Sequence, residues 1–248
     1  MEDIHCWEEK FKPCLYSDRL LNKVDSLNRL VKQPVDMTEL KKSIYYARKY
    51  HGVQMRQSGE AYYSHPLEVA YMLAEYAANE DHKYYRTDIL VTAILHDTIE
   101  DTRLTEGIIL DIFGKKISTQ VECLTRIKDK GNKISSTEIV EFLFREKKDG
   151  LLMIKLFDRL HNMQTIGAKS PEKIKKVLEE TFKVFLIATA YLNHTYLENE
   201  LSKLCLEKTF INTSSLHPVG FFEDNSLLLS LGFQNDLNQM QNLILREL

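Results

Sequence analysis

Hydrophobic residues recur every three to four positions along most of the chain, which is the spacing of one face of an α-helix. The first such stretch predicts a helix that ends near Pro34, and it contains Leu20, Leu21, Val24, Leu27, Leu30 and Val31. The same spacing predicts a helix that opens at His65-Pro66, and others over residues 38–50, 86–101, 104–113, 116–127, 136–147, 151–165, 170–192, 195–207 and 236–247. The pattern therefore predicts a chain built almost entirely from helices.

Residues that favour helix ends support several of these boundaries. Asp36 with Glu39 forms a capping pair before the helix over 38–50, and Gly52 follows the end of that helix. Pro66 occupies the first turn, which is the part of a helix that tolerates proline. Gly114 is expected to close the helix over 104–113.

The composition favours an all-α fold of ordinary domain size. The chain has 248 residues, 44% of them hydrophobic, with only 9 glycines and 5 prolines. This length is ample for one core with appendages. We expect an N-terminal helical extension (1–35), a helical domain (36–208) and a C-terminal tail (209–248). The tail mixes turn residues with apolar clusters, so it is a candidate for regulation or for contact with a partner or a second copy.

Charge and cysteine usage argue against several functional classes. The formal net charge of −3 gives no electrostatic basis for general nucleic-acid binding. The four cysteines are dispersed, without the spacing of a zinc cluster or a disulfide framework, which fits a reducing cytoplasm. The N-terminus lacks a signal-peptide pattern, and no apolar run reaches membrane-spanning length. We therefore expect a cytoplasmic protein that binds neither nucleic acid nor membrane.

The most informative polar residues follow the apolar run over 88–95, which predicts a buried helix. His96, Asp97, Glu100 and Asp101 come within six residues. On a helix that continues through this motif, their side chains would share an arc of about 140°. Three carboxylates near a core repel one another and are costly to desolvate unless they are paired. A divalent cation with imidazole and carboxylate ligands would remove that cost. The alternative is a charged helix end that faces solvent.

A second group of polar residues lies on the predicted helix over 151–165. Asp158 and Asn162 are four residues apart, so they share a face, and Thr165 lies within reach of the same region. We interpret His161, in the same stretch, as a partly buried packing residue.

Ordinary structural roles are alternatives for three of the candidate residues. Asp158 could form an ion pair with Lys155 or Arg159. Arg56 could be an ordinary loop charge, and His65 could be a helix-end residue in contact with solvent. The residues considered one by one leave these alternatives open.

Taken together, several separate stretches resemble a known family. The chain resembles the N-terminal hydrolase domain of the RelA/SpoT enzymes, within the HD-domain superfamily of metal-dependent phosphohydrolases. The stretches that carry the resemblance are Arg56 to Pro66, Leu95 to Thr102, Phe113-Gly114 and Lys155 to Thr165, in this order within about residues 40–192. The resemblance implies an all-α HD-domain helical bundle with N- and C-terminal helical extensions. The synthetase domain that follows in the long enzymes has no counterpart here, so we expect the hydrolase domain alone.

The resemblance implies an activity and assigns roles to individual residues. The reaction would be removal of the 3′-pyrophosphate from the alarmone ppGpp or pppGpp, giving GDP or GTP and pyrophosphate. The family's metal ligands, which usually hold Mn²⁺, fall on His65, His96, Asp97 and Asp158. The acids that handle the attacking water fall on Glu100 and Asp101. The candidate nucleotide contacts are Arg56, Gln57, Ser58, Asn162 and Thr165.

The chain departs from the family pattern at three positions. Gln57 stands where the hydrolases often have a basic residue, Gln164 where they commonly have Arg, and Phe157 where a small residue is usual. These changes concern nucleotide contacts rather than the metal site. Two other functions stay open: another HD-type phosphohydrolase acting on dNTPs or on the 2′-phosphate of NADPH, and a nucleotide-sensing module that has lost catalysis.

Overall fold

A computed structural model describes residues 6–125 and 134–214 of the chain. Its regular structure is helical, and the one pairing of extended segments in these ranges is an isolated bridge between Met55 and Ala61. The expected all-α fold class is therefore confirmed. No helix in these ranges is both long and apolar enough to cross a bilayer. The predicted loop over 129–133 and the predicted helix over 236–247 lie outside the described residues.

The chain divides into two compact units, Met1–Ala168 and Lys169–Leu248. The domain boundaries expected after residues 35 and 208 stay predictions. In the first unit, short 3-10 turns lie at His82–Tyr84 and Ile166–Ala168. Its helices are α1 (Trp7–Lys10), α2 (Leu15–Asn28), α3 (Met37–His51), α4 (Ser64–Asn79), α5 (Thr87–Leu95), α6 (Thr98–Asp101), α7 (Glu106–Leu124), α8 (Ser136–Arg145) and α9 (Asp149–Gln164).

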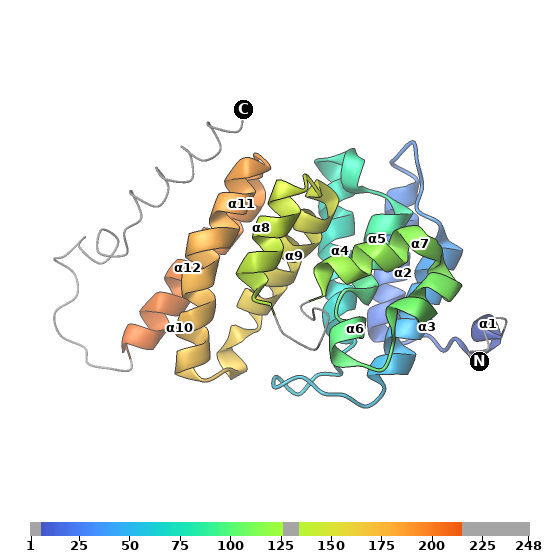
Figure 1. The fold of residues 1–248 in the computed structure, drawn as a ribbon, viewed down its shortest axis with the longest axis horizontal. Coiled ribbons are helices and arrows are strands. Elements are labelled where there is room, and N and C mark those ends of the chain that lie inside the picture. The colour runs from blue at the N-terminus through green and yellow to red at the C-terminus, as the bar shows by residue number, and fades with distance from the viewer. Residues whose placement is uncertain (1–5, 126–133, 215–248) are drawn as a thin grey trace. The chain divides into compact units, whose positions relative to one another are not determined.

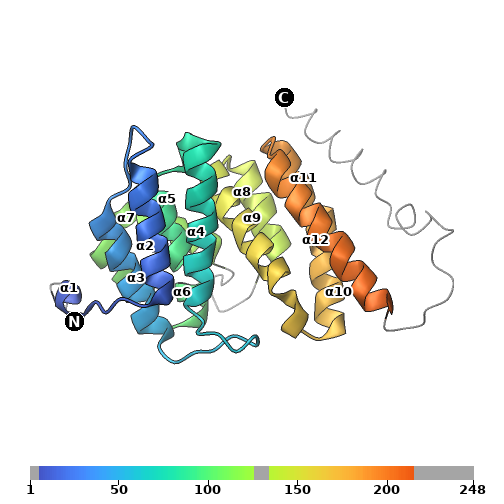
Figure 2. The same cartoon turned by 180° about the vertical axis from the view of Figure 1, so that it is seen from behind.

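Helices α4, α5 and α9 form the centre of the first unit. Helix α4 packs against α2, α5 and α9, and α5 also packs against α3 and α7 (Figure 1). From behind, α2 and α4 lie side by side (Figure 2). Every residue from Ile89 to Leu95 is buried, and so is every residue from Leu151 to His161. Helices that are buried on all sides belong to a core, so the polar residues that lie in or directly after these helices are held by rigid surroundings.

The boundaries of α3 follow the sequence prediction, whereas α2 ends earlier than expected. The Asp36 carboxylate accepts from the backbone N–H groups of Thr38 and Glu39, and Gly52 follows the helix with φ of 53°. Helix α2 ends at Asn28, because the Asn28 side-chain amide bonds both backbone groups of Val35 and turns the chain back. Leu30 is consequently 68% exposed instead of packing on the apolar face.

The second unit continues with helices that follow the prediction closely. They are α10 (Pro171–Glu180), a π-helical turn over Thr181–Phe185, α11 (Leu186–Tyr191) and α12 (Thr195–Ser214). The predicted helix over 170–192 is thus present, with one wider turn inside it. At this turn the Thr181 hydroxyl donates to the carbonyl of Val177. Helix α12 extends to Ser214, past the predicted end at residue 207.

An aromatic cluster attaches the N-terminal segment to α3 and α7. Trp7 is buried with Tyr46 and Ile112, and the ring of Trp7 lies 6.4 Å from that of Tyr45 between centroids. Partly buried neighbours complete the cluster, namely Phe11, Tyr45, Tyr50, Ile108 and Phe113. The short helix α1 is therefore held by side-chain packing rather than by its own length, which is too small for independent stability.

The break predicted at Gly114 occurs inside α7. Gly114 has φ of 81° and ψ of 171°, a conformation open essentially to glycine alone. The two parts of α7 therefore meet at a kink that depends on the absence of a side chain at this position.

Replacing Gly114 with alanine is expected to lower the free energy of unfolding by about 1–3 kcal/mol. An added Cβ would meet nothing within 4 Å, so the cost comes from the backbone conformation. Gly107→Ala in the same helix is the control, because Gly107 has no positive φ and alanine is the better helix former by about 1 kcal/mol. Urea denaturation of both variants tests this, and equal stability of the two would contradict it.

Candidate active site

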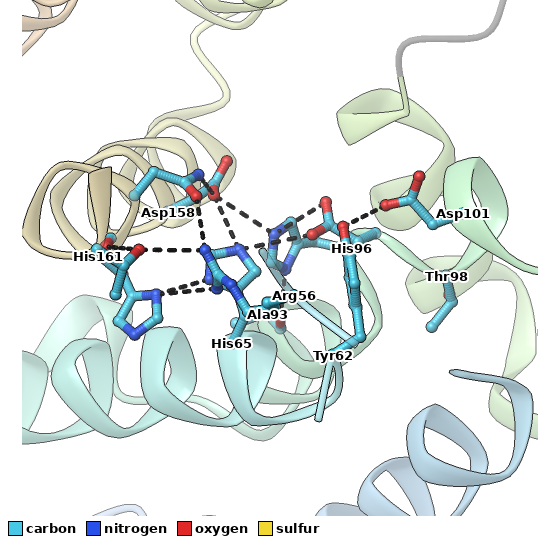
Figure 3. Close-up of polar contacts among 12 residues, drawn as sticks. Arg56, Tyr62, His65, Ala93, His96, Thr98, Asp101, Asp158 and His161 are labelled. Carbon is cyan, nitrogen blue, oxygen red and sulfur yellow. Dashed lines mark hydrogen bonds and ion pairs between the residues drawn. The ribbon is translucent and has the colours of Figure 1, made fainter. Parts of the chain in front are cut away.

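Three packed helices bring together the four residues that the sequence suggested as metal ligands. His65 lies in the first turn of α4, His96 and Asp97 follow α5, and Asp158 lies within α9. Figure 3 shows the His65 and His96 rings and the Asp158 carboxylate directed toward one another. Because α4 packs against both α5 and α9, residues more than 90 positions apart in sequence meet at one point.

The distances define a compact cluster of nitrogen and oxygen donors. His65 Nε2 lies 3.1 Å from Asp158 Oδ1 and 3.5 Å from Asp97 Oδ2. His96 Nε2 lies 3.1 Å from Asp97 Oδ1 and 3.8 Å from Asp158 Oδ1. One donor atom each from His65, His96 and Asp158 fits within 4.8 Å, a spacing that could hold a metal ion.

The donor set fits a divalent cation. His96 is 2% exposed, and among the described residues its Nε2 atom has no hydrogen-bond partner although two carboxylates lie nearby. A buried polar atom of this kind is rare unless another group completes it. Two imidazoles with two carboxylates form a mixed nitrogen and oxygen set that suits a first-row divalent metal.

The electrostatics of the cluster also favour a cation. Burial lowers the pKa of His96, but the negative charges of Asp97 and Asp158 outweigh this and raise it to about 10. Burial alone would raise the pKa of Asp158, yet Lys155 and the two histidines hold it well below its ordinary value. Both carboxylates therefore stay ionised, and they attract positive charge to this largely buried cluster.

The helix that leads to His96 does not continue as expected. The hydrophobic spacing predicts one helix over 86–101, but α5 ends at Leu95 and α6 begins at Thr98. The His96 ring nitrogen Nδ1 bonds the carbonyl of Ala93, and the Thr98 hydroxyl donates to the carbonyl of Leu95. These side chains bond backbone carbonyls that would accept from backbone N–H groups if the helix continued. Polar side chains compete with helix hydrogen bonds in this way.

Asp158 is held on both of its oxygens. Lys155 Nζ donates to Oδ2 at 2.6 Å, and Asn162 Nδ2 donates to Oδ1 at 2.6 Å. Lys155 is 6% exposed, so this ion pair is buried. From the sequence, an ion pair with Lys155 is an alternative to a metal-binding role for Asp158. In the structure Asp158 makes the pair and still faces the two histidines.

The two further acids of the motif lie in α6, the short helix that begins directly after Asp97. The Tyr62 hydroxyl donates to Asp101 Oδ2, and the Gln54 side chain donates to the carbonyl of Asp101. Burial, with the charges of Asp97 and Glu100, raises the pKa of the Asp101 carboxyl. Tyr62 and Gln54 were not predicted as site residues. The one available signal was that Tyr62 lies inside the stretch from Arg56 to Pro66 that carries the family resemblance, with Gln54 two residues before it.

His51 contacts both Tyr62 and Gln54 on this side of the site. It is another residue that was not among the predicted site residues. Its ring stacks on Tyr62 with centroids 4.7 Å apart, and its Nδ1 atom bonds Gln54 Oε1 at 2.8 Å. His51, Gln54 and Tyr62 therefore form a packed support behind Asp101.

The structure brings together three of the five candidate nucleotide contacts. Arg56 Nη2 donates to Asn162 Oδ1 and to Thr165 Oγ1, both at 3.2 Å. Gln57 and Ser58 are exposed on the loop between α3 and α4. Within the described part of the chain, no hydrogen bond or ion pair joins their side chains to this group. Their role as nucleotide contacts stays a prediction.

His161 contacts both halves of the site. Its Nδ1 atom lies 2.7 Å from His65 Nδ1 and 3.4 Å from Arg56 Nη1 (Figure 3). Burial, together with the neighbouring His65 and Arg56, lowers the pKa of His161 to about 3, so the ring is neutral. The sequence predicted a partly buried packing residue here, whereas His161 is 8% exposed and makes polar contacts with both His65 and Arg56.

Comparisons with known proteins identify relatives of this chain. A family model described as "HD domain" matches residues 43–189. The GTP pyrophosphokinase rsh of Brucella ovis is 32% identical over 207 residues, which cover 81% of this chain and 26% of that protein. The bifunctional (p)ppGpp synthase/hydrolase SpoT of Escherichia coli K12 is 33% identical over 196 residues, covering 76% and 27%. The chain thus spans about a quarter of the length of these curated relatives.

A solved structure shares the fold. It is described as "A metazoan ortholog of SpoT hydrolyzes ppGpp and plays a role in starvation responses". The TM-score is 0.51 with 19% sequence identity, and the alignment covers 72% of this chain and 98% of that one. At this identity the likeness establishes the helical architecture and nothing finer.

Proposed function

Because the chain belongs to the HD-domain family, and its HD region is homologous to that of the RelA/SpoT enzymes, we propose that it hydrolyses the alarmones ppGpp and pppGpp. Water would add across the bond between the ribose 3′-oxygen and its pyrophosphate, giving GDP or GTP and free pyrophosphate. The observation that carries the proposal is the juxtaposition of the histidine and aspartate cluster with an acid pair on one side and Arg56 on the other.

His65, His96, Asp97 and Asp158 would hold a divalent ion, for which we propose Mn²⁺. When bound, such an ion supplies positive charge to the phosphate under attack and lowers the pKa of water. Lys155 and Asn162 fix the Asp158 carboxylate in the orientation that faces the histidines. This support leaves the carboxylate little freedom to rotate, which is what a preorganised site requires.

Glu100 and Asp101 would orient the attacking water and accept its proton. The Tyr62 hydroxyl donates to Asp101 Oδ2 and orients the carboxylate, whose other lone pairs can receive a proton. A raised pKa makes the Asp101 carboxylate a stronger base near neutral pH, which supports Asp101 for this role. Glu100 would then position the water from the same short helix.

Arg56 would bind the nucleotide together with Asn162 and Thr165. A guanidinium offers a planar fork that can hold phosphate or stack on a base. Its contacts with Asn162 and Thr165 hold the group in place before the nucleotide arrives. Because the Arg56 side chain is already ordered, less conformational entropy is lost when the nucleotide binds.

The direct test is incubation of the purified chain with labelled ppGpp, with Mn²⁺ or with EDTA. We expect pyrophosphate and GDP in the presence of Mn²⁺ and neither product with EDTA. A panel with pppGpp, dNTPs and NADPH separates this activity from that of other HD-type phosphohydrolases. Binding of ppGpp without release of pyrophosphate would instead indicate a sensing module, and no effect on any of these nucleotides would reject the proposal.

Tyr62→Phe is expected to lower kcat about tenfold while leaving Mn²⁺ affinity unchanged. The change removes one hydrogen bond to a charged group, worth about 1.5–3 kcal/mol, and part of that loss appears in the transition state. Tyr63→Phe is the matched control, because Tyr63 contacts Tyr16 and Arg48 instead of the site. Steady-state kinetics at saturating Mn²⁺ measure the effect. Equal kcat values for the two variants would show that Tyr62 does not support Asp101.

A further inference from the structure

His161 joins two parts of the site that the proposed mechanism treats separately. It lies in α9, and its ring centroid is 4.9 Å from that of His65 in α4. The closest atoms are the two Nδ1 nitrogens, 2.7 Å apart. Such a distance between ring nitrogens requires a proton on one of them, because two lone pairs would repel.

The neighbouring arginine determines which nitrogen carries that proton. Arg56 Nη1 lies 3.4 Å from the same His161 Nδ1 atom. A guanidinium has donors and no acceptor, so a hydrogen bond from Arg56 requires a lone pair on His161 Nδ1. The proton between the two rings therefore belongs to His65 Nδ1, which donates to His161.

The consequence concerns the other nitrogen of His65. A neutral imidazole protonated at Nδ1 has its lone pair at Nε2. In this structure Nε2 is the atom that faces Asp158 Oδ1 at 3.1 Å and Asp97 Oδ2 at 3.5 Å. An ionised Asp158 at this distance would repel that lone pair unless a cation lay between the two atoms, so the tautomer selected by His161 is the one that ligates a metal at the cluster.

We infer that His161 is a positioning residue that fixes the orientation and tautomer of His65 for metal binding, and that it links this ligand to Arg56 on the nucleotide side. The inference rests on the metal site of the proposed function. Hydrogen-bond partners of ligating histidines typically contribute about 10–100-fold to metal affinity. His161 therefore acts through His65 and needs no contact with the reacting atoms.

The test compares His161→Asn with His161→Leu in the full chain. The Asn side-chain oxygen occupies a position close to that of the histidine Nδ1 and accepts a hydrogen bond, whereas Leu fills similar space without an acceptor. Mn²⁺ binding to the metal-free protein is followed by electron paramagnetic resonance. We expect His161→Leu to weaken Mn²⁺ binding about 10–100-fold and His161→Asn to recover most of that loss.

The dependence of activity on Mn²⁺ concentration distinguishes a defect in metal binding from a general structural defect. The activity lost in His161→Leu at limiting Mn²⁺ should return as Mn²⁺ is raised, because the defect is in metal binding. His82→Leu is the matched control, since His82 bonds the carbonyl of Ala78 and is expected to keep wild-type affinity. If His161→Leu does not fold, His161→Phe replaces it, because Phe keeps a planar ring and has no hydrogen-bond acceptor.

The outcomes separate the inference from the proposed function. Wild-type Mn²⁺ affinity in His161→Leu or its Phe substitute, with loss of binding in His65→Ala, would overturn the inference and leave the metal site standing. Equal weakening in the Asn variant and the acceptor-deficient variant would also overturn it. Absence of Mn²⁺ binding by the wild type, or unchanged binding by His65→Ala, would reject the metal site and the inference with it.

Discussion

Asp97→Ala is expected to abolish Mn²⁺ binding and to lower turnover of ppGpp by about 10³-fold or more, since metal charge contributes several kcal/mol to the transition state. Asp97 faces both histidines of the cluster, at 3.5 Å from His65 Nε2 and 3.1 Å from His96 Nε2. Its side chain is 19% exposed, so the substitution leaves no large buried cavity. The loss should therefore appear in metal binding rather than in folding.

Two measurements check this expectation. Mn²⁺ should raise the thermal unfolding temperature of the wild type, because a ligand that binds the folded state stabilises it, and should leave that of Asp97→Ala unchanged. The control is Asp88→Ala, since Asp88 has a similar side-chain exposure of 14% and pairs with Arg86 and Lys116 away from the cluster. Full turnover in Asp97→Ala would refute the assignment of this ligand.

Glu100→Gln and Asp101→Asn are each expected to keep Mn²⁺ affinity while kcat falls by about 10²–10⁴-fold. Both changes preserve the size of the side chain and remove its ability to accept a proton as a carboxylate. Of the two, Asp101→Asn should have the larger effect, because the Tyr62 hydroxyl holds Asp101 beside the cluster and burial raises the pKa of its carboxyl.

The measurement is kcat at saturating Mn²⁺, paired with a metal titration of each variant. Glu106→Gln serves as the control, since Glu106 is exposed at the start of α7. If either variant lost Mn²⁺ affinity as well as kcat, the replaced acid would be a metal ligand. If both kept full kcat, the acid pair would have no part in handling water.

The sequence was sufficient to select the residues of the cluster but not their detailed geometry. His96 and Asp97 could be selected because an unusual density of ligand-type side chains follows an apolar run, and both signals are local. The break between α5 and α6 was missed, because it depends on where the His96 and Thr98 side chains direct their hydrogen bonds. The four candidate ligands still meet despite this break, because the packing of α4 against α5 and α9 brings His65 and Asp158 close to the two residues that follow α5.

Other features could not be predicted because they depend on contacts between distant segments. A histidine in an apolar helix gives no local sign of its partner, and His161 meets His65 from 96 positions away. Tyr62 likewise meets Asp101 across 39 positions. Gln57 and Ser58 were placed with the nucleotide contacts by resemblance, and the folded loop leaves both exposed.

The aromatic cluster around α1 has a practical consequence for spectroscopy. The chain contains one tryptophan, so its intrinsic indole fluorescence reports on a single known environment. Trp7 is 8% exposed and packs near Tyr45, which places this fluorophore where α1 meets α3. Excitation of tyrosine should transfer energy to Trp7 while α1 is docked, and a red shift of its emission should mark the moment when this segment releases.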